Sequence, residues 1–315
     1  MPADVRLNAQ TEFGRARRTA EMERLTAWLR GRDARLLPFD TIRRNLRQQS
    51  PFYRGLQEVP LDLIVGSVGR YAEMTREFLP LNDNLKDRWV KMAELAHGEG
   101  WPPIELYKVS NAYFVRDGNH RVSAARRLRF PTIEAHVWEY PEDIEISPKD
   151  SLDDVLNRFR ERVFLEKTEL DRQFAGYDIR FTAVGRYPEL QAQIEELRQK
   201  LELIDEREVS FVEASAAWYE LIYLPSVQII RESGLLEAFP GRTEADLFAW
   251  MSLHRDRLRE QYGDFRNLAE LAHSLMSTYR EKPAARVSRQ VRRLLGSGEL
   301  PPLGGLDEAA ADEEE

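Results

Sequence analysis

Apolar positions in the first half of the chain fall into short strand-length runs separated by segments with helical spacing. The runs that predict strands are 59–64, 104–109, 112–116 and 132–140. Helices are expected at 83–97, where apolar residues recur every three or four positions, and from Asn119 to Leu128. A helix between strands, a hairpin and a second helix together predict a small mixed-sheet domain at 51–146.

The second half of the chain, from residue 150, is dominated by helical spacing. Ser210 and Thr243 stand at N-cap positions, three residues before Glu213 and Asp246, so each is expected to begin a helix. This part of the chain therefore predicts a mostly helical domain at 147–296. The fold class expected for the whole chain is α+β, a small mixed sheet followed by helices.

The two ends of the chain differ in charge, although the net charge is only −8 over 315 residues. Residues 1–50 hold 11 arginines against six acids, and helical spacing at 9–31 predicts a helix with Phe13, Met22, Leu25 and Leu29 facing inward. We therefore expect 1–50 to form basic helices packed on the next domain. The glycine, proline and acid-rich stretch 297–315 is expected to be disordered.

Composition excludes several classes of function. The chain has no cysteine, which excludes disulfides, thiolate metal sites and cysteine nucleophiles and fits a reducing cytoplasm. No apolar run approaches the ~18–20 residues that span a bilayer. The first residues also lack the apolar core of a signal peptide. A cytoplasmic protein without membrane spans is expected.

The strongest candidate for chemistry is the turn between the strand that ends at Arg116 and the helix that follows. Asp117-Gly118 is a turn dipeptide, and Gly118 lets the backbone approach a ligand closely. The free N–H groups and the dipole of a helix N-terminus favour an anion. His120 and Arg121 add two cation-capable side chains in the first helical turn. The residues alone therefore predict a phosphate-binding turn.

The same residues resemble a known family. Asp117-Gly-Asn-His-Arg121, followed by Ala124-Ala-Arg126, resembles the nucleotide-phosphate turn of the ParB/sulfiredoxin superfamily. Blocks at 59–64, 101–106 and 133–137 are similar to strands of that fold, in the right order, so the resemblance covers about a quarter of the chain. It implies that the phosphate-binding residues are Gly118, Asn119, His120, Arg121 and Ser123. It places Arg70 across the cleft, with Ser67 and Tyr71 as weaker candidates.

Proteins of this superfamily bind ATP, ADP or CTP, and the turn here is closest to that of the archaeal free serine kinases. Those enzymes use ADP to phosphorylate a small hydroxyl compound. The resemblance implies that Asp117 and His120 are catalytic, with Asp117 holding Mg²⁺ on the nucleotide or orienting His120. Kinase chemistry also needs a carboxylate that accepts the hydroxyl proton, and Glu73 is the nearest acid after the first strand. Sulfiredoxin activity is excluded, because its essential cysteine is replaced by Asn119.

Two alternatives stay open beside a nucleotide-binding protein or kinase. A ParB-like DNA-associated regulator, switched by CTP or ATP, is motivated by the arginines of 1–50 and of 286–293, although no strong helix-turn-helix follows residue 140. A ParB-like nuclease would need clustered acids at two-metal spacing, which the sequence lacks.

The second half adds little about chemistry. Segments at 179–187 and 218–247 are similar to an uncharacterised bacterial domain that can accompany ParB-like segments. The unusual loop 239–246 contains Arg242, which could reach a ligand. We expect instead a structural turn in which this arginine pairs with a local acid.

Overall fold

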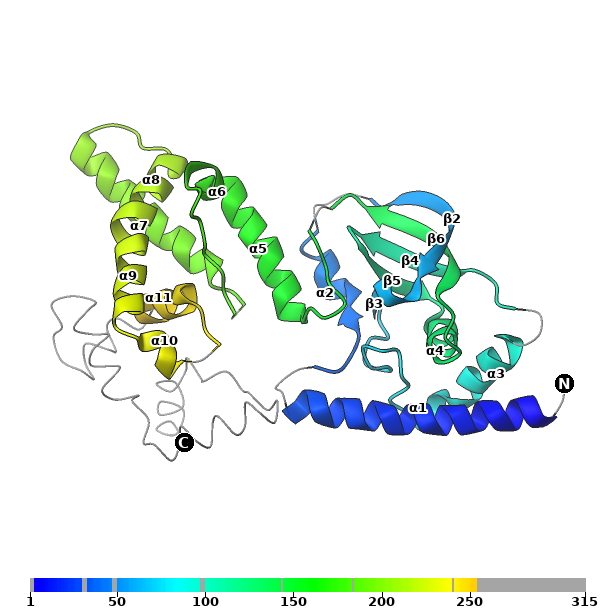
Figure 1. Ribbon diagram of the computed structural model, residues 1–315. Helices are drawn as coiled ribbons and strands as arrows, with labels where there is room; N and C mark the ends of the chain where they lie inside the picture. Colours follow the sequence, from blue (N-terminus) through cyan, green and yellow to red (C-terminus); the bar gives the residue numbers. More distant parts are fainter. Residues whose placement is uncertain are drawn as a thin grey trace, which may run out of the picture. The chain divides into compact units, whose positions relative to one another are not determined.

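The computed structural model describes residues 3–29, 33–46, 50–96, 100–142, 144–182, 184–239 and 241–253. The chain divides into two compact units, Met1–Leu156 and Asn157–Glu315 (Figure 1). The predicted domain boundary at 146 lies shortly before this division. The basic segment 286–293 and the predicted disordered stretch 297–315 lie outside the described residues. No helix in the described part of the chain combines the length and the apolar composition that a membrane span requires.

The first unit is built on one six-stranded mixed sheet with the strand order β1-β3-β5-β4-β6-β2. The strands are β1 Leu37–Pro38, β2 Phe52–Pro60, β3 Ile64–Ser67, β4 Ile104–Val109, β5 Ala112–Asp117 and β6 Thr132–Tyr140. β1, β3 and β5 run parallel to one another, and β4 and β6 form a second parallel pair. The β4–β5 hairpin joins the two sets, and β2 pairs antiparallel with β6. Together with the helices, this sheet confirms the predicted α+β class.

The helices of the first unit are α1 Ala3–Leu29, α2 Phe39–Arg43, α3 Lys86–Ala96 and α4 Asn119–Arg127. Two 3₁₀ turns, Leu61–Leu63 and Asp83–Leu85, precede β3 and α3. α4 packs on one face of the sheet, where its Val122 joins Ile104 and Val115 in the core. α3 then packs on α4, and α1 lies along α3, so Phe13, Trp89 and Ala124 share one apolar cluster (Figure 1).

The predicted N-terminal helix is present as α1, but its predicted inward face is wrong in the second half. Met22 is 64% exposed and Leu25 is 51% exposed. The buried stripe instead consists of Phe13 and three small residues, Ala9, Ala16 and Ala20. These residues recur at helical spacing, and their small side chains let the helix backbone approach the surface on which it packs. Large apolar residues were therefore a poor guide to the contact face.

The first predicted strand, 59–64, is divided in the structure. Its beginning is the end of β2, its centre is the 3₁₀ turn Leu61–Leu63, and its last residue begins β3. Gly66 lies inside β3 between β1 and β5. A Cβ there would collide with the Leu37 carbonyl oxygen and the Phe114 ring, so only glycine permits this close packing.

The second unit is mostly helical, as predicted. Its helices are α5 Leu152–Thr168, which begins before the division, α6 Leu170–Gln173, α7 Tyr187–Asp205, α8 Phe211–Trp218, a π-helix at Tyr219–Tyr223, α9 Leu224–Glu232, α10 Leu235–Ala238 and α11 Glu244–Leu253. Aromatic rings fill its core, with Trp218 stacked on Tyr223 at 5.4 Å between ring centroids. The π-helix precedes Pro225, which has no N–H for a regular helical bond, so the wider turn accommodates the proline.

Both predicted helix caps of the second unit are present. The Ser210 hydroxyl accepts a bond from the Glu213 N–H at 3.1 Å. The Thr243 hydroxyl accepts one from the Asp246 N–H at 3.1 Å, and the Thr243 N–H donates back to the Asp246 carboxylate at 3.0 Å. These local bonds begin α8 and α11 at the residues that the sequence indicated.

Candidate anion-binding site

The predicted phosphate turn lies where two parallel strands end. β3 and β5 are parallel neighbours, so their carboxyl ends lie at the same edge of the sheet. β5 continues through Gly118 into α4, and β3 continues into the loop that carries Arg70. The Val68 N–H donates to the Val115 carbonyl at 2.9 Å, which extends the pairing past the end of β3. Ligands of α/β sheets commonly bind at the carboxyl ends of parallel strands.

Gly118 is the residue that makes the turn possible. Its backbone has φ 119° and ψ 18°, a conformation that residues with side chains rarely adopt. A Cβ at this position would lie 2.5 Å from Cγ2 and 2.9 Å from Cβ of the buried Ile104. Both the backbone angle and the available space therefore require glycine.

Gly118→Ala should lower the free energy of unfolding by about 2–3 kcal/mol, because it combines backbone strain with overpacking against Ile104. Urea denaturation would measure the loss. Gly14→Ala is the matched control, since Gly14 lies in α1 with open space at its Cβ position and should gain up to about 1 kcal/mol. Unchanged stability in Gly118→Ala would contradict the proposed role of this glycine.

The N-terminus of α4 has the local features that favour an anion. Gly118 is its N-cap residue, no side chain caps it, and its first turn contains no acid. The first four N–H groups of a helix have no partner within the helix, and the helix dipole adds roughly half a positive charge at this end. α4 is nine residues long, so the dipole is well formed.

Asn119 and Ser67 lie beneath the turn and connect it to β3. The Asn119 Nδ2 donates to the Ser67 hydroxyl at 2.9 Å, and that hydroxyl donates to the Val115 carbonyl at 3.3 Å. Ser67 is fully buried and Asn119 is 9% exposed. The Asn119 Oδ1 is buried and has no hydrogen-bond partner among the described residues. These two residues therefore form the floor of the site and leave one acceptor atom unused.

His120 lies in the first turn of α4, and both of its ring nitrogens are buried without a hydrogen-bond partner among the described residues. Burial, together with the positive charges of Arg88 and Arg70, lowers the pKa of His120 from 6.5 to about 4. The imidazole is therefore neutral at physiological pH. The first turn of α4 therefore carries an uncharged histidine that is under the influence of two cationic side chains.

Arg70 and Arg88 are the exposed cations of this cluster. Arg70 follows β3, and Arg88 projects from α3. Neither guanidinium has an ion pair or a hydrogen-bond acceptor within the part of the chain that the structure describes, unlike most arginines of this unit. Sequence analysis identified Arg70 but missed Arg88. An arginine on the polar side of an amphipathic helix carries no local signal of function.

Arg121 and Asp117 pair with each other at the entrance of the turn. Arg121 also donates to the carbonyls of Pro102 and Pro103 at 2.8 and 3.0 Å, so its terminal nitrogens hold the loop before β4. Its Nε lies 3.3 Å from the position that a Gly118 Cβ would occupy. Arg121 therefore supports the turn and contributes positive charge from a guanidinium that is already bonded.

Asp117 is 68% exposed and is the acid next to the turn. No group of three or more His, Asp or Glu side chains suited to a metal ion occurs within the described residues. A Mg²⁺ ion at Asp117 would therefore have one carboxylate from the protein and would depend on nucleotide phosphates and water for its other ligands.

The remaining predicted site residues do not all face the turn. Ser123 is 3% exposed and accepts a hydrogen bond from the Trp89 indole at 2.8 Å, so its hydroxyl faces α3 rather than the turn. Tyr71 lies under the Arg35 guanidinium, 5.8 Å from the ring centroid. Glu73 follows Arg70 in a tight turn, and its Oε2 is buried without a partner within the described part of the chain.

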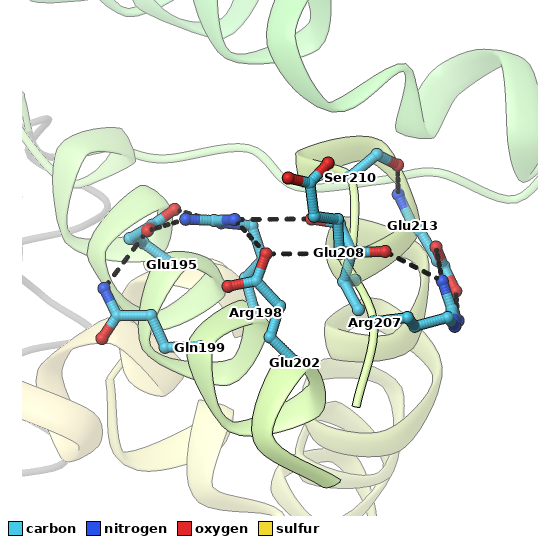
Figure 2. Close-up of polar contacts among 9 residues, drawn as sticks. Glu195, Arg198, Gln199, Glu202, Arg207, Glu208, Ser210 and Glu213 are labelled. Carbon is cyan, nitrogen blue, oxygen red and sulfur yellow. Dashed lines mark hydrogen bonds and ion pairs between the residues drawn. The ribbon is translucent and has the colours of Figure 1, made fainter. Parts of the chain in front are cut away.

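The polar cluster between α7 and α8 in the second unit is accounted for by ion pairing and helix capping. Figure 2 shows Arg198 bonded to Glu195 and Glu202 at 2.6 Å each, and Arg207 bonded to Glu213. A groove of about 480 Å³ beside them is lined by Lys167, Gln191, Ala192, Glu195 and Phe211. Because its carboxylate is already paired, we assign the groove no catalytic role.

The loop 239–246 is a structural turn, as predicted, although its contacts differ in detail. The Arg242 guanidinium donates to the Thr182 hydroxyl at 2.7 Å, and Asp246 is the acid whose charge stabilises the guanidinium. Asp246 is 1% exposed and fixes the extended segment before α7 to the start of α11. This arrangement explains the sequence of the loop without a ligand.

No family model, no curated protein and no solved structure matches the chain.

Proposed function

We propose that this protein binds a nucleotide through its phosphates at the carboxyl ends of β3 and β5. The observation that carries the proposal is the uncapped N-terminus of α4, together with Arg70 and Arg88, whose charges act on His120 in its first turn and which have no acid partner among the described residues. Backbone N–H groups, a helix dipole and two guanidinium groups all favour a multiply charged anion. The resemblance of Asp117–Arg121 to the ParB/sulfiredoxin turn supports a nucleotide as the source of that anion.

Calorimetric titration with ATP, ADP and CTP, each with and without Mg²⁺, tests the proposal and identifies the base. The double variant Arg70→Ala/Arg88→Ala should weaken nucleotide binding by about 1.5–3 kcal/mol, because it removes charge-assisted contacts. The dissociation constant should then rise by about 10–150-fold. Both side chains are exposed, so the melting temperature should stay near that of the wild type.

Lys91→Ala is the matched control, because Lys91 is an exposed cation on the same helix as Arg88. It should bind nucleotide as the wild type does. If the double variant and the wild type had the same affinity, the site would lie elsewhere.

Phosphotransfer to a small hydroxyl compound is the enzymatic extension of this proposal. The observation that favours it is Glu73, an acid in the loop after β3 with a buried and unpartnered carboxylate oxygen among the described residues. Such a group can accept a hydroxyl proton. With Mg²⁺ and ATP or ADP, Glu73→Gln should keep nucleotide binding and lose transfer, while Asp117→Asn should lose transfer through the metal. Tight binding without transfer over hours would favour a ParB-like switch.

The DNA-linked alternative gains little from the described residues. Several arginines of α1 are paired with acids, among them Arg15 with Glu12 at 2.7 Å, Arg17 with Asp83 at 3.0 Å and Arg24 with Glu21 at 2.8 Å. These pairs support the interpretation of α1 as a solvated, locally neutralised helix rather than an arm that binds a polyanion. We therefore rank DNA-linked regulation below nucleotide binding.

A further inference from the structure

We infer that the site selects a doubly charged terminal phosphate over a singly charged phosphodiester, and that His120 takes up a proton when this dianion binds. The inference rests on the proposed function, since it concerns the same site. It assigns His120 a role that differs from catalysis, namely the supply of a third positive charge only when the anion is present.

The first step is the position of the imidazole. His120 is the second residue of α4, directly after Asn119. Both ring nitrogens are buried, and neither has a hydrogen-bond partner among the described residues. A neutral imidazole donates from one nitrogen and accepts at the other, whereas an imidazolium donates from both. Two buried nitrogens without partners represent unused hydrogen-bonding capacity beside an open helix N-terminus.

The second step is the set of charges around the ring. Arg88 on α3 and Arg70 in the loop after β3 are the charges that, after burial itself, lower the pKa of His120. Among the described residues no acid acts on the pKa of the ring; Asp117 pairs with Arg121, and Asp40 on α2 accepts a bond from the Gly69 N–H at 3.2 Å. The ring therefore faces a positive environment in the free protein.

The third step is the effect of an anion. Burial and the two arginines lower the pKa of His120 to about 4 in the free protein, so the ring is neutral. A dianion between Arg70 and Arg88 would cancel their charges and offer an acceptor to the imidazolium, and both changes raise the pKa of His120. By linkage, a group that binds protons more tightly in the complex makes anion binding stronger as the pH falls.

The fourth step is selectivity. In the free protein, two guanidinium groups and the helix dipole supply the positive charge that attracts an anion. When the anion binds, the proton taken up by His120 adds one further positive charge. A terminal phosphate carries up to two negative charges, whereas each phosphate of a nucleic acid backbone carries one. An anion with a single charge compensates the two arginines less completely, so it raises the pKa of His120 less. A smaller fraction of His120 is then protonated in the complex. The site therefore favours a nucleotide terminus or another phosphomonoester.

Sulfate is the probe for the test, because it is tetrahedral and remains doubly charged from about pH 8 to about pH 5. Its affinity should rise with falling pH, by up to about tenfold per pH unit where one proton is taken up per anion. Calorimetry near pH 6 in two buffers of different ionisation enthalpy should report an uptake approaching one proton. Methanesulfonate, of similar shape and one charge less, should bind more weakly and with less uptake.

Two variants assign the proton. His120→Gln should bind sulfate with no more than a small pH dependence and without proton uptake. Arg88→Gln should raise the pKa of His120 in the free protein, as followed by the imidazole C–H signal in NMR spectra, because one of the two opposing charges is gone. Circular dichroism at the lowest pH confirms that each protein is still folded.

The outcomes separate the two proposals. Absence of sulfate and nucleotide binding at every pH would overturn the proposed function and this inference with it. Binding without proton uptake, or an equal pH dependence in His120→Gln, would overturn the inference alone. Equal affinities for sulfate and methanesulfonate would remove the selectivity for dianions.

Discussion

Arg126→Ala should lower the free energy of unfolding of the first unit by about 3–5 kcal/mol, although Arg126 is outside the anion site. Its guanidinium is 17% exposed and donates to the Leu61 and Ile64 carbonyls at 2.6 and 2.9 Å. It also pairs with Glu77 at 2.9 Å and lies 5.0 Å from the Phe78 ring centroid. Removal would take a charged donor from both carbonyls, although the Leu61 carbonyl keeps a bond from the Ile64 N–H. A hydrogen bond to a charged group contributes about 1.5–3 kcal/mol.

Hydrogen exchange resolved by peptide would locate the loss of stability in the first unit. Arg88→Ala is the matched control, because it removes an exposed arginine of the same unit and should change stability by no more than about 0.5 kcal/mol. Similar losses in the two variants would show that Arg126 does not connect α4 to the chain between β2 and α3.

Asp246→Ala should destabilise the second unit by a similar amount, about 3–5 kcal/mol. The Asp246 carboxylate is 1% exposed. It accepts bonds from the Thr182 N–H at 3.0 Å, the Thr182 hydroxyl at 2.6 Å and the Thr243 N–H at 3.0 Å. Alanine would leave these donors, and the neighbouring Arg242 guanidinium, without their acceptor in a buried environment.

Chemical denaturation with hydrogen exchange of the segment 177–182 would measure this effect. Asp171→Ala, which removes an exposed carboxylate of the same unit, should change stability by about 0.5 kcal/mol or less. If Asp246→Ala behaved like Asp171→Ala, the carboxylate would not be the group that fixes the extended segment to α11.

Local signals in the sequence predicted the elements whose pairing partners are close in sequence. The hairpin strands β4 and β5 were placed to within one residue, because an apolar alternation and a short turn lie next to each other in the chain. β1 was missed, and β2 and β3 were predicted only where the expected strand 59–64 overlaps their ends. β1 has two residues and contains a proline, and β3 contains Gly66, so neither has strand propensity of its own. Pairing with residues distant in sequence makes them strands.

In the candidate site too, features set by neighbouring residues could be predicted and features set by tertiary packing could not. Gly118 and His120 could be identified because the turn and the helix start are contiguous in the sequence. Arg88 could not, since α3 reaches the turn only through packing against α4. The neutral state of His120 was equally hidden, because it depends on burial and on arginines from two other segments. For Ser123, the indole of Trp89 decides the orientation, and that contact also arises from packing.

The strand order also has a consequence for how the protein is made on the ribosome. β2 is synthesised early, yet its partner in the sheet is β6, which is complete only when residue 140 has been added. The β4–β5 hairpin and α4 can form as soon as they leave the exit tunnel, because their contacts are short in sequence. We therefore expect the sheet to assemble from its centre outward, out of chain order. A nascent chain that stops before residue 132 leaves β2 without a neighbour, exposed to chaperones and to other unfinished chains.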